Sequence, residues 1–584
     1  MPALSKNATC VLEARYLLKD EAGRVVEGFD DLCTRVAGAV AEAERAFGGA
    51  PEPWFDRFRE AIHRLEFLPN SPTLMNAGTP VGQLAACFVL PLEDSLDGIF
   101  ETLKRMAGIH QSGGGTGFDF SRLRPEGDVV RATHGIASGP VSFLGVFDAA
   151  TAVIKQGGRR RGANMGVLRI DHPDVRQFIR CKSDPTRYTN FNLSVTTTDE
   201  FWRTATSGGS IGLVNPRTGR AVERVDAAAL LREIAEHAWA SGDPGVLFLE
   251  AINRDNPTPK LGTLTTVNPC GELPLLPNEA CNLGSIRLDA FVEKGAINWE
   301  RLDATVDLAV RFLDDVIEVS RYPYPEIADI TRANRKIGLG VMGFADFLVE
   351  LGIPYDSEVA VETAGRVMRR IRARAERASE TLANERGMFA NYTGSRAEAR
   401  GQKLRNATLT SIAPTGTLSI IAGCCGGIEP YFALAFVRHV LDGQKLPETN
   451  PRFEAALRAA GCWSADLVAE VQARGTVRGM ASVPEKIRRL FPTAPDIASE
   501  WHLSIQQAFQ EQVDNAVSKT INLPAAATPD DVQAIYTSAW RRGLKGVTVF
   551  REGCKGVAVL VRGEGQAVEA PAEYAGDCAA THCT

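Results

Sequence analysis

Apolar and polar positions along this chain follow two different periods. Short apolar pieces of strand length recur between about residues 86 and 285, namely ACFVL, GTGFDF, MGVLRI, NLSVTTT, SIGLVN and GVLFLE. Segments with helical periodicity separate several of them, as at 95–110 and 227–240. Strands that alternate with helices favour an α/β fold with a largely parallel sheet.

Longer helices flank this region. Residues 34–66 have helical periodicity with a break at GGAPEPW, which predicts an N-terminal helical subdomain. Residues 299–320 place one apolar face on a helix, formed by Leu302, Val306, Val310, Leu313 and Ile317. The charged segment 357–386 predicts a helix on the outside, and a further helix at 499–517 precedes a late strand at 545–550.

Composition narrows the class of protein. The 584 residues are 44% hydrophobic and 23% charged, with a net charge of −6, so no global basic field attracts duplex DNA or an anionic membrane. No signal peptide and no apolar run of about twenty residues is present, and we expect a cytoplasmic protein. The twelve cysteines show no paired CxxC pattern, so no protein-bound metal is expected.

Three regions are predicted along the chain. These are an N-terminal helical region at 1–66, a large α/β domain at 67–562 and a tail at 563–584. The tail reads GEGQAVEAPAEYAGDCAATHCT and has few large apolar residues, which is typical of a mobile segment.

The stretch TVNPCGELPLLPNEACNLGS combines a thiol, an amide and a carboxylate. Asn268, Cys270 and Glu272 occupy every second position, and Cys281 follows eleven residues after Cys270. In an extended segment, alternate side chains point to the same face. The spacing therefore predicts that these three groups converge on one substrate.

Three glycine-dense loops are candidate ligand sites. They read SGGGTGFDFSRLRP (112–125), KQGGRRRGANMG (155–166) and SIAPTGTLSIIAG (411–423). Glycines let a backbone approach a ligand closely, and small hydroxyl residues at a turn suit phosphate oxygens. None matches a P-loop, and each alone is equally consistent with an ordinary turn. The arginines of the second loop are also consistent with a solvated face or a single-strand nucleic-acid contact, although no aromatic residue lies beside them.

Taken together, eight motifs in fixed order carry a resemblance. They are LPNSPTLMNAG, ACFVLPLEDS, GGGTGFDFSRLRP, ASGPVSF, QGGRRRGANMG, NPCGE, NLGSI and APTGT. Over roughly residues 10–555 the chain resembles the catalytic chain of ribonucleotide reductases, most closely the adenosylcobalamin-dependent (class II) branch. The resemblance implies a ten-stranded α/β barrel of two antiparallel half-barrels, each of parallel strands, around a central finger loop.

It also implies a reaction and the residues that perform it. Ribonucleotides, with diphosphates favoured, would be reduced to 2′-deoxyribonucleotides. A thiyl radical at Cys270 would abstract the C3′ hydrogen of the ribose, Glu272 would act as the general base, and Asn268 would hold the ribose hydroxyls. Cys87 and Cys281, on neighbouring strands, would supply two electrons and end as a disulfide.

Binding segments follow from the same motifs. Those matched to substrate binding are Ser71, Ala86, Cys87, Gly115, Asn268, Pro414, Thr415, Gly416 and Thr417. Those matched to a deoxynucleotide specificity effector are Asp94, Ser95, Leu96 and Arg124. The loop that relays effector identity to the substrate base contains Gln156, Arg159, Arg160 and Arg161.

Cysteines in the tail match a further requirement of the family. Cys578 and Cys583 are expected to reduce the buried disulfide by thiol exchange and to be regenerated by thioredoxin or a similar dithiol. Adventitious metal binding by these cysteines and His582 is the alternative. A homodimer is expected because effectors of similar enzymes bind at a helical interface.

Residues near the end of the barrel distinguish the branches. Val549 and Phe550 lie where class I enzymes carry a relay of two tyrosines, so no radical-generating second subunit is expected. No glycyl-radical motif of the RVxGY type is present, which leaves adenosylcobalamin as the cofactor. The first motif begins close to the N-terminus without room for an ATP-cone, so specificity control is expected without overall control by ATP and dATP.

One departure leaves alternatives open. The segment GCCGGIEP carries adjacent Cys424 and Cys425, where relatives mostly have small hydroxyl residues. Adjacent cysteines also occur in pyruvate formate-lyase, a glycyl-radical enzyme, although NPCGE argues against that reading. A catalytically inactive nucleotide sensor is a further alternative. We favour packing beside the predicted phosphate turn as the role of this pair.

Overall fold

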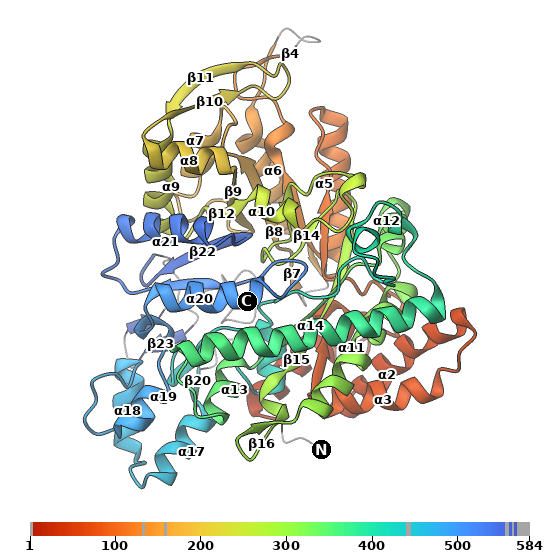
Figure 1. Cartoon of the computed structure of the whole chain (residues 1–584), viewed down its shortest axis with the longest axis vertical. Coiled ribbons are helices and arrows are strands. Elements are labelled where there is room, and N and C mark those ends of the chain that lie inside the picture. The colour runs from red at the N-terminus through yellow and green to blue at the C-terminus, as the bar shows by residue number, and fades with distance from the viewer. Residues whose placement is uncertain are drawn as a thin grey trace.

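The centre of the computed structural model is a mixed sheet of ten strands (Figure 1). The structure describes residues 4–130, 135–156, 160–439, 445–554, 560–562 and 566–568. The strands of this sheet are β1 (Phe67–Pro69), β2 (Cys87–Leu90), β3 (Gly115–Asp119), β8 (Asn164–Arg169), β9 (Phe191–Thr197), β12 (Gly245–Phe248), β15 (Ala280–Arg287), β18 (Ile337–Met342), β21 (Thr520–Leu523) and β22 (Gly546–Arg551).

The strands form two antiparallel halves. In the first half β2, β3, β8, β9 and β12 run parallel to their neighbours. In the second half β15 pairs in parallel with β18, and β21 pairs in parallel with β22. The segment 410–412 lies between these two pairs, with a parallel bridge from Thr410 to Leu339 of β18 and another from Ile412 to Val517. Antiparallel pairing of β15 with β2 and of β12 with β22 joins the halves. This confirms the predicted barrel of two half-barrels, with β1 as an extra strand on β15.

Burial on both faces explains the apolar character of these strands. Every residue of β18 and all but the last residue of β15 and β8 are buried, as expected where helices cover a parallel sheet. The main helices of the barrel are α5 (Leu96–Gln111), α6 (Gly139–Val153), α7 (Val175–Arg180), α8 (Asp199–Ser207), α9 (Ala227–Ser241), α10 (Leu249–Arg254), α12 (Pro325–Asn334), α13 (Phe344–Glu350), α16 (Gly416–Ala422), α20 (Ser499–Gln510) and α21 (Pro529–Arg541). The helix predicted at 499–517 is shorter in the structure, because α20 ends at Gln510 and the chain turns after it.

The N-terminal region has four helices, α1 (Lys6–Val11), α2 (Phe29–Ala41), α3 (Glu52–His63) and α4 (Ser71–Asn76). Of these, α1 contacts α16 and α4 contacts α2. Helices α2 and α3 pack against the long helix α11 (Trp299–Val319), as the lower right of Figure 1 shows. Phe312 of α11 joins them to the barrel, with ring centroids 5.0 Å from Phe58 and 5.3 Å from Phe67. The predicted break at GGAPEPW begins between α2 and α3, but its last three residues form the first turn of α3.

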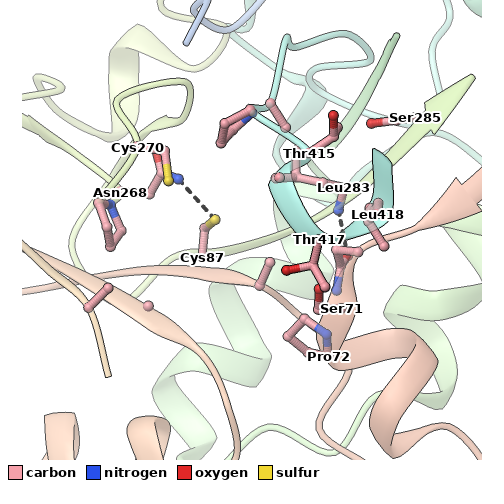
Figure 2. Close-up of a pocket in the computed structure, with 18 of the residues that line it drawn as sticks. Ser71, Pro72, Cys87, Asn268, Cys270, Leu283, Ser285, Thr415, Thr417 and Leu418 are labelled. Atoms are coloured by element: carbon pink, nitrogen blue, oxygen red, sulfur yellow. Dashed lines mark hydrogen bonds between the residues drawn. The ribbon is translucent and has the colours of Figure 1, made fainter. Parts of the chain in front are cut away.

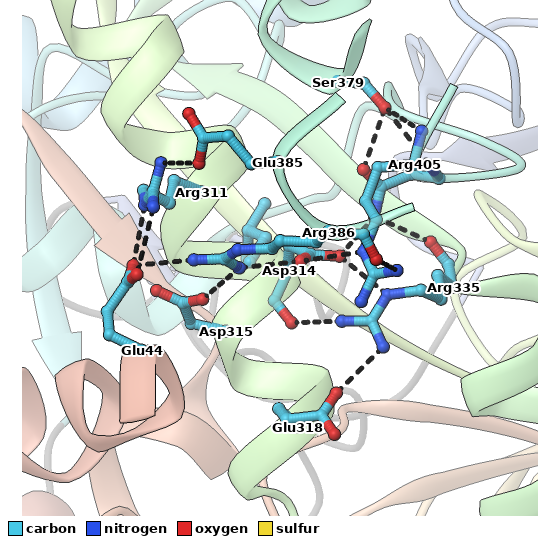
Figure 3. A network of polar contacts seen from close by, with 12 residues as sticks. Glu44, Arg311, Asp314, Asp315, Glu318, Arg335, Ser379, Glu385, Arg386 and Arg405 are labelled. Carbon is cyan, nitrogen blue, oxygen red and sulfur yellow. Dashed lines mark hydrogen bonds and ion pairs between the residues drawn. The ribbon is translucent and has the colours of Figure 1, made fainter. Parts of the chain in front are cut away.

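Helix α14 (Glu358–Arg386) lies across the front of the molecule in Figure 1 and packs on α11. Its charges predict a helix on the outside, but the side chain of its last residue, Arg386, is buried. Arg386 is paired with Glu44 at 2.7 Å, Asp314 at 2.9 Å and Asp315 at 2.6 Å (Figure 3). Buried charges persist only when paired and hydrogen-bonded. The network therefore ties the N-terminal region to the barrel.

Smaller elements complete the described residues. The remaining helices are α15 (Arg396–Ala399), α17 (Pro451–Ala459), α18 (Ala465–Arg474) and α19 (Glu485–Leu490). Two-stranded hairpins are β4 (Val129–Val130) with β5 (Gly135–Ile136), β6 (Lys155–Gln156) with β7 (Arg160–Arg161), β10 (Ser210–Val214) with β11 (Ala221–Asp226), β13 (Thr266–Val267) with β14 (Pro274–Leu275), and β16 (Val292–Glu293) with β17 (Ala296–Ile297). A four-stranded sheet contains β19 (Ala435–His439), β20 (Lys445–Thr449), β23 (Leu560–Arg562) and β24 (Gln566–Val568).

The predicted tail is described only in part. Strand β24 belongs to the segment after residue 563, whereas Cys578 and Cys583 lie outside the described residues. The mobility of the tail and the domain boundaries stay predictions. Within the described part of the chain, no helix has the length and apolar character needed to cross a membrane.

Candidate active site

The residues around Cys270 form the loop of a hairpin between β13 and β14. The Asn268 N–H donates to the Leu273 carbonyl at 3.2 Å, and the Leu273 N–H donates to Asn268 Oδ1 at 2.9 Å. Gly271 has a φ of +83°, a conformation that favours glycine. The prediction of an extended segment at 268–272 is therefore wrong. Asn268, Cys270 and Glu272 meet in one pocket because the loop turns.

Glycines of β3 make room for this hairpin inside the barrel. A Cβ at Gly117 would lie 1.9 Å from the Val267 carbonyl oxygen, and one at Gly115 would lie 2.9 Å from Pro269 Cγ. Both contacts are shorter than van der Waals distance. The glycine-dense loop that we expected to admit a ligand thus also admits the chain's own finger loop.

Three residues that sequence reasoning missed hold the loop in place. Asn192 of β9 donates to the Pro269 carbonyl at 2.8 Å. The Glu272 carbonyl accepts from the Ala516 N–H at 2.8 Å and from the Ser411 hydroxyl at 3.0 Å. Ser411 begins the third glycine-dense loop, but no local pattern assigned this role to any of the three, since each role depends on a contact with a distant segment.

A pocket of about 120 Å³ brings together the predicted substrate-binding residues and, except for Cys281, the predicted catalytic residues (Figure 2). Its lining includes Ser71, Ala86, Cys87, Gly115, Asn268, Cys270, Glu272, Pro414, Thr415, Gly416 and Thr417. Figure 2 shows Cys87, Asn268 and Cys270 at one end and the hydroxyls of Ser71 and Thr417 toward the other. The pocket therefore separates a thiol end from a hydroxyl end.

Cys87 and Cys281 are neighbours across two strands. They are directly opposed in the antiparallel pairing of β2 with β15. The Asn268 Nδ2 lies 3.0 Å from Cys87 Sγ. Cys281 is fully buried behind the pocket, and this burial, with the nearby Glu279 carboxylate, raises the pKa of its thiol well above the usual range. Cys281 is accordingly protonated at neutral pH.

A second pocket, of about 100 Å³, adjoins the first at the finger loop. Asn192, Pro269 and Cys270 line both pockets, so Cys270 is placed between them. Val549 and Phe550 line the second pocket, which places these positions next to the finger loop. Neither side chain can be oxidised to a tyrosyl radical.

The hydroxyl end of the first pocket is built around a strained turn. Thr415 has a φ of +53° and its Oγ1 accepts the Gly427 N–H at 2.7 Å, which fixes the turn that begins α16. Across the pocket, Tyr16 and Ser71 share a hydrogen bond of 2.8 Å between their hydroxyls. Tyr16 comes from the N-terminal region and lies in no motif that marks it as a site residue.

The predicted effector residues lie together, apart from this pocket. Arg124 donates to both carboxylate oxygens of Asp94, at 2.9 and 3.1 Å. Ser95 caps α5 by accepting the Gly98 N–H at 3.1 Å, and Leu96 is 64% exposed.

The predicted relay loop begins as the hairpin of β6 and β7, in which Gln156 pairs with Arg160. Arg159 lies outside the described residues, and the backbone of Arg161 is in β7. The segment that follows passes α5, since a Cβ at Gly162 would lie 2.5 Å from His110 Nδ1, and Ala163 lines the first pocket. The chain thus runs from the hairpin to the pocket along α5.

The adjacent Cys424 and Cys425 do not line either pocket beside Cys270. Cys425 Sγ accepts the Ala345 N–H at 3.2 Å. Burial raises the pKa of both thiols well above their usual range. This arrangement supports packing and offers no thiol to a substrate in the first pocket.

Among the described residues, Cys424 also forms a possible metal-ligand group with Asp289 and Asp346, whose ligand atoms lie within 4.8 Å of one another. Both carboxylates are already paired with arginine. Asp289 binds Arg287 at 2.8 Å, and Asp346 binds Arg452 at 3.1 Å. These cations neutralise the cluster without a metal ion.

Comparisons with known families cover nearly the whole chain. The model of the ribonucleotide reductase barrel domain matches residues 85–404 and 396–550, and the model of the ribonucleotide reductase all-alpha domain matches residues 3–82. The second match extends beyond residue 66, where we had placed the end of the helical region.

Among curated proteins, one from Mycobacterium tuberculosis (strain CDC 1551 / Oshkosh) is 52% identical over 99% of this chain and 84% of its own length. One from Thermoplasma acidophilum is 46% identical over 96% of this chain and 80% of its own length. Both are named vitamin B12-dependent ribonucleoside-diphosphate reductase.

A solved structure has the same fold. The class Id ribonucleotide reductase alpha subunit of Actinobacillus ureae aligns with a TM-score of 0.76 at 22% identity, over 94% of this chain and 97% of that one. With the finger loop, the opposed thiols and the two matched domains, these findings show that the chain belongs to the ribonucleotide reductase family.

Proposed function

We propose that this chain reduces ribonucleoside diphosphates to 2′-deoxyribonucleoside diphosphates in a radical reaction that depends on adenosylcobalamin. The names of its relatives from Mycobacterium tuberculosis and Thermoplasma acidophilum support this activity. The structural observation that carries it is the position of Cys270, on a finger loop between two pockets.

The residues of the first pocket suit the chemistry of a ribose. Cys270, as a thiyl radical, abstracts the hydrogen from C3′, and Glu272 accepts the proton of the 3′-hydroxyl. The amide of Asn268, which lies beside Cys87, holds the ribose hydroxyls. Loss of the 2′-hydroxyl as water requires one added proton, which a neighbouring thiol supplies.

Cys87 and Cys281 supply the two electrons of the reduction. Their two thiols lose two hydrogens as the C2′ hydroxyl is replaced by hydrogen, and a Cys87–Cys281 disulfide forms. Cys270 regains its radical when it returns a hydrogen to C3′. The directly opposed positions of Cys87 and Cys281 support this pairing.

The hydroxyl end of the same pocket suits the phosphates of the substrate. Ser71, Thr415 and Thr417 offer hydroxyl groups, and the turn at Pro414–Gly416 adds backbone groups. Bare N–H groups at a turn form a concave site for anions. A nucleotide that places its ribose at Cys270 thereby directs its phosphates toward these groups.

The second pocket is suited to the cofactor. The hydroxyls of Ser518 and Thr548 and the apolar side chains of Val549 and Phe550 line it, which matches a ligand with both polar and apolar parts. Adenosylcobalamin, when bound, supplies an organic radical by homolysis of its cobalt–carbon bond. Because Cys270 also lines this pocket, its thiol is accessible from the side opposite to the substrate.

Specificity control and a homodimer belong to the same proposal. Asp94, Ser95, Leu96 and Arg124 form the effector site, and the β6–β7 hairpin relays its state to the pocket. Exposed apolar side chains on α5 and α6 support an interface there, namely Leu96, Phe100, Val146 and Val153. Large exposed apolar groups on neighbouring helices mark association surfaces.

Cys578 and Cys583 are proposed as the shuttle that reduces the Cys87–Cys281 disulfide, with thioredoxin or a similar dithiol as the external reductant. Cys281 is fully buried, which supports a carrier that enters through the pocket at Cys87.

A turnover assay tests the function. The purified chain is incubated with each ribonucleoside diphosphate and triphosphate, with dithiol, and with or without adenosylcobalamin. We expect deoxynucleotide formation only with the cofactor, and none with Cys270→Ala at unchanged thermal stability. Turnover without adenosylcobalamin in the presence of a metal-loaded second subunit would overturn the assignment.

A further inference from the structure

A third cavity, of about 450 Å³, lies apart from both pockets at Cys270. None of its lining residues lines either of those pockets. Five arginines from four parts of the fold line it, namely Arg254, Arg372, Arg396, Arg400 and Arg542. The chain as a whole has a net charge of −6, so a cluster of five positively charged side chains stands out against the overall negative charge.

Asp255, one of four carboxylates in the lining, is already surrounded by cations. Its Oδ1 accepts from Arg396 at 2.7 Å, and its Oδ2 lies 3.1 Å from Arg254 and 3.3 Å from Lys545. Burial would raise the pKa of Asp255, but these three cations hold it well below its usual range. Asp255 therefore positions the arginines and leaves them with a positive excess.

Asp514 is committed to the protein backbone. Its Oδ2 accepts the N–H groups of Leu409 and Thr410 at 2.9 and 3.3 Å, and its Oδ1 lies 3.4 Å from Arg372. Arg372 also donates to Glu376 at 3.1 Å. These contacts fix the Arg372 guanidinium in the wall of the cavity.

Arg400 is the cation that remains available. Arg400 is exposed, and its guanidinium makes no hydrogen bond or ion pair with the residues that the structure describes. Arg254 has a 56% exposed side chain and a single carboxylate contact, to Asp255. Each guanidinium has five N–H donors in a planar fork. Donors of both residues are therefore free to bind an anion in the cavity.

We propose that this cavity binds a multiply charged phosphoanion, such as pyrophosphate, triphosphate or the phosphate chain of a nucleotide. Guanidinium groups match phosphate oxygens with two parallel hydrogen bonds, and several of them converge here from α10, α14 and α15. No aromatic side chain is among the described residues that line the cavity, so the phosphates and not a stacked base are recognised.

Calorimetric titration of the full chain with inorganic pyrophosphate and triphosphate, at low salt and without adenosylcobalamin, tests this site. We expect saturable binding, weakened roughly tenfold by Arg400→Ala and again by Arg254→Ala, because a charge-assisted hydrogen bond is lost each time. Both side chains are at the surface, so the variants retain the fold. Arg377→Ala is the matched control, since Arg377 is an exposed arginine of α14 that does not line the cavity and whose guanidinium, among the residues that the structure describes, donates to the Ala373 carbonyl alone.

Unchanged affinity in Arg400→Ala, equal loss in Arg377→Ala, or no binding to the wild-type chain would each overturn the proposal. Titrations with ATP identify the source of the anion. If the chain binds ATP more tightly than triphosphate, and Arg400→Ala loses this binding, the site recognises a nucleotide. Equal affinity indicates that the phosphate chain alone is recognised. The measurement needs no turnover, so its failure is distinct from failure of the proposed reduction.

Discussion

Cys87 of β2 lies directly opposite Cys281 of β15, although 193 intervening residues separate them in the chain. Directly opposed residues of antiparallel strands have Cα atoms about 4.5–5.5 Å apart. That separation lies within the range of about 4.4–6.8 Å found for disulfides. The two thiols can therefore join without movement of the backbone.

A turnover experiment without external reductant tests this pair. With adenosylcobalamin and substrate, a chain that carries Cys578→Ser and Cys583→Ser should form about one deoxynucleotide per active site, because one dithiol supplies two electrons, and then hold a Cys87–Cys281 disulfide, seen by peptide mass mapping. Cys281→Ser should form neither. Cys33→Ser, at a buried cysteine outside the site, should behave as wild type. A disulfide that joins Cys270 to either residue would contradict the assigned roles.

Glu272→Gln should lower kcat by about 10²–10⁴-fold, because the amide cannot accept the 3′-hydroxyl proton. The fold should persist, since it is the backbone carbonyl of Glu272 that Ser411 and Ala516 hold. Steady-state kinetics together with a thermal melt separate the two effects. An unchanged kcat would exclude Glu272 as the base.

Gly117→Ala should displace the finger loop. The added Cβ would lie 1.9 Å from the Val267 carbonyl oxygen, and overpacking of this kind costs about 1–3 kcal/mol or more. We expect kcat/KM to fall by about 10²-fold, since small misplacements of reacting groups have effects of that size.

Gly365→Ala is the matched control. Gly365 lies within α14, nothing lies within 4 Å of its added Cβ, and alanine should stabilise the helix by about 0.5–1 kcal/mol. Denaturant unfolding measures both variants. Equal effects of the two substitutions would show that the close approach at Gly117 is unimportant.

Arg386→Met should destabilise the chain by about 3–5 kcal/mol, because Asp315, whose ion pair among the described residues is with Arg386, would be left as an unpaired buried carboxylate. Glu44 and Asp314 also pair with Arg386 but keep the cations of Arg311 and Arg335 (Figure 3). Arg45→Met removes an exposed pair with Glu42 and should change the free energy of unfolding by less than about 1 kcal/mol. Similar values for the two variants would mean that the network adds no net stability.

Lys545 predicts a dependence of stability on pH. Burial lowers the pKa of Lys545 to about 8 from 10.5. Between these two values the unfolded chain binds more protons at this residue than the folded chain, so stability rises with pH. The free energy of unfolding of wild type relative to Lys545→Met should therefore increase from about pH 8 to about pH 10.5. A decrease over that range would show that Lys545 is not desolvated.

Local pattern was sufficient for much of the fold. The alternation of apolar pieces and helical segments predicted the α/β class, and the helix at 299–320 is observed as α11 (Trp299–Val319). The spacing of apolar residues indicates the backbone conformation of a segment, because side chains on one face recur about every 3.6 residues in a helix and every second residue in a strand. The charged helix α14 shows the limit of this signal. The charged composition of α14 predicted exposure to solvent. The Arg386 side chain is nevertheless buried, because it forms ion pairs with Glu44 and with Asp314 of α11.

The sequence by itself supplied the motifs that identify the family, and with them the prediction that Cys270, Glu272, Asn268, Cys87 and Cys281 perform the chemistry. Only the tertiary structure decided how they meet: a turn at Gly271, a glycine gap in β3, and the pairing of β2 with β15. The same holds for the arginine cavity, whose arginines come from four separate parts of the chain. Contacts between residues far apart in the chain depend on which strands pair and which helices pack together. The local spacing of apolar residues does not predict these pairings.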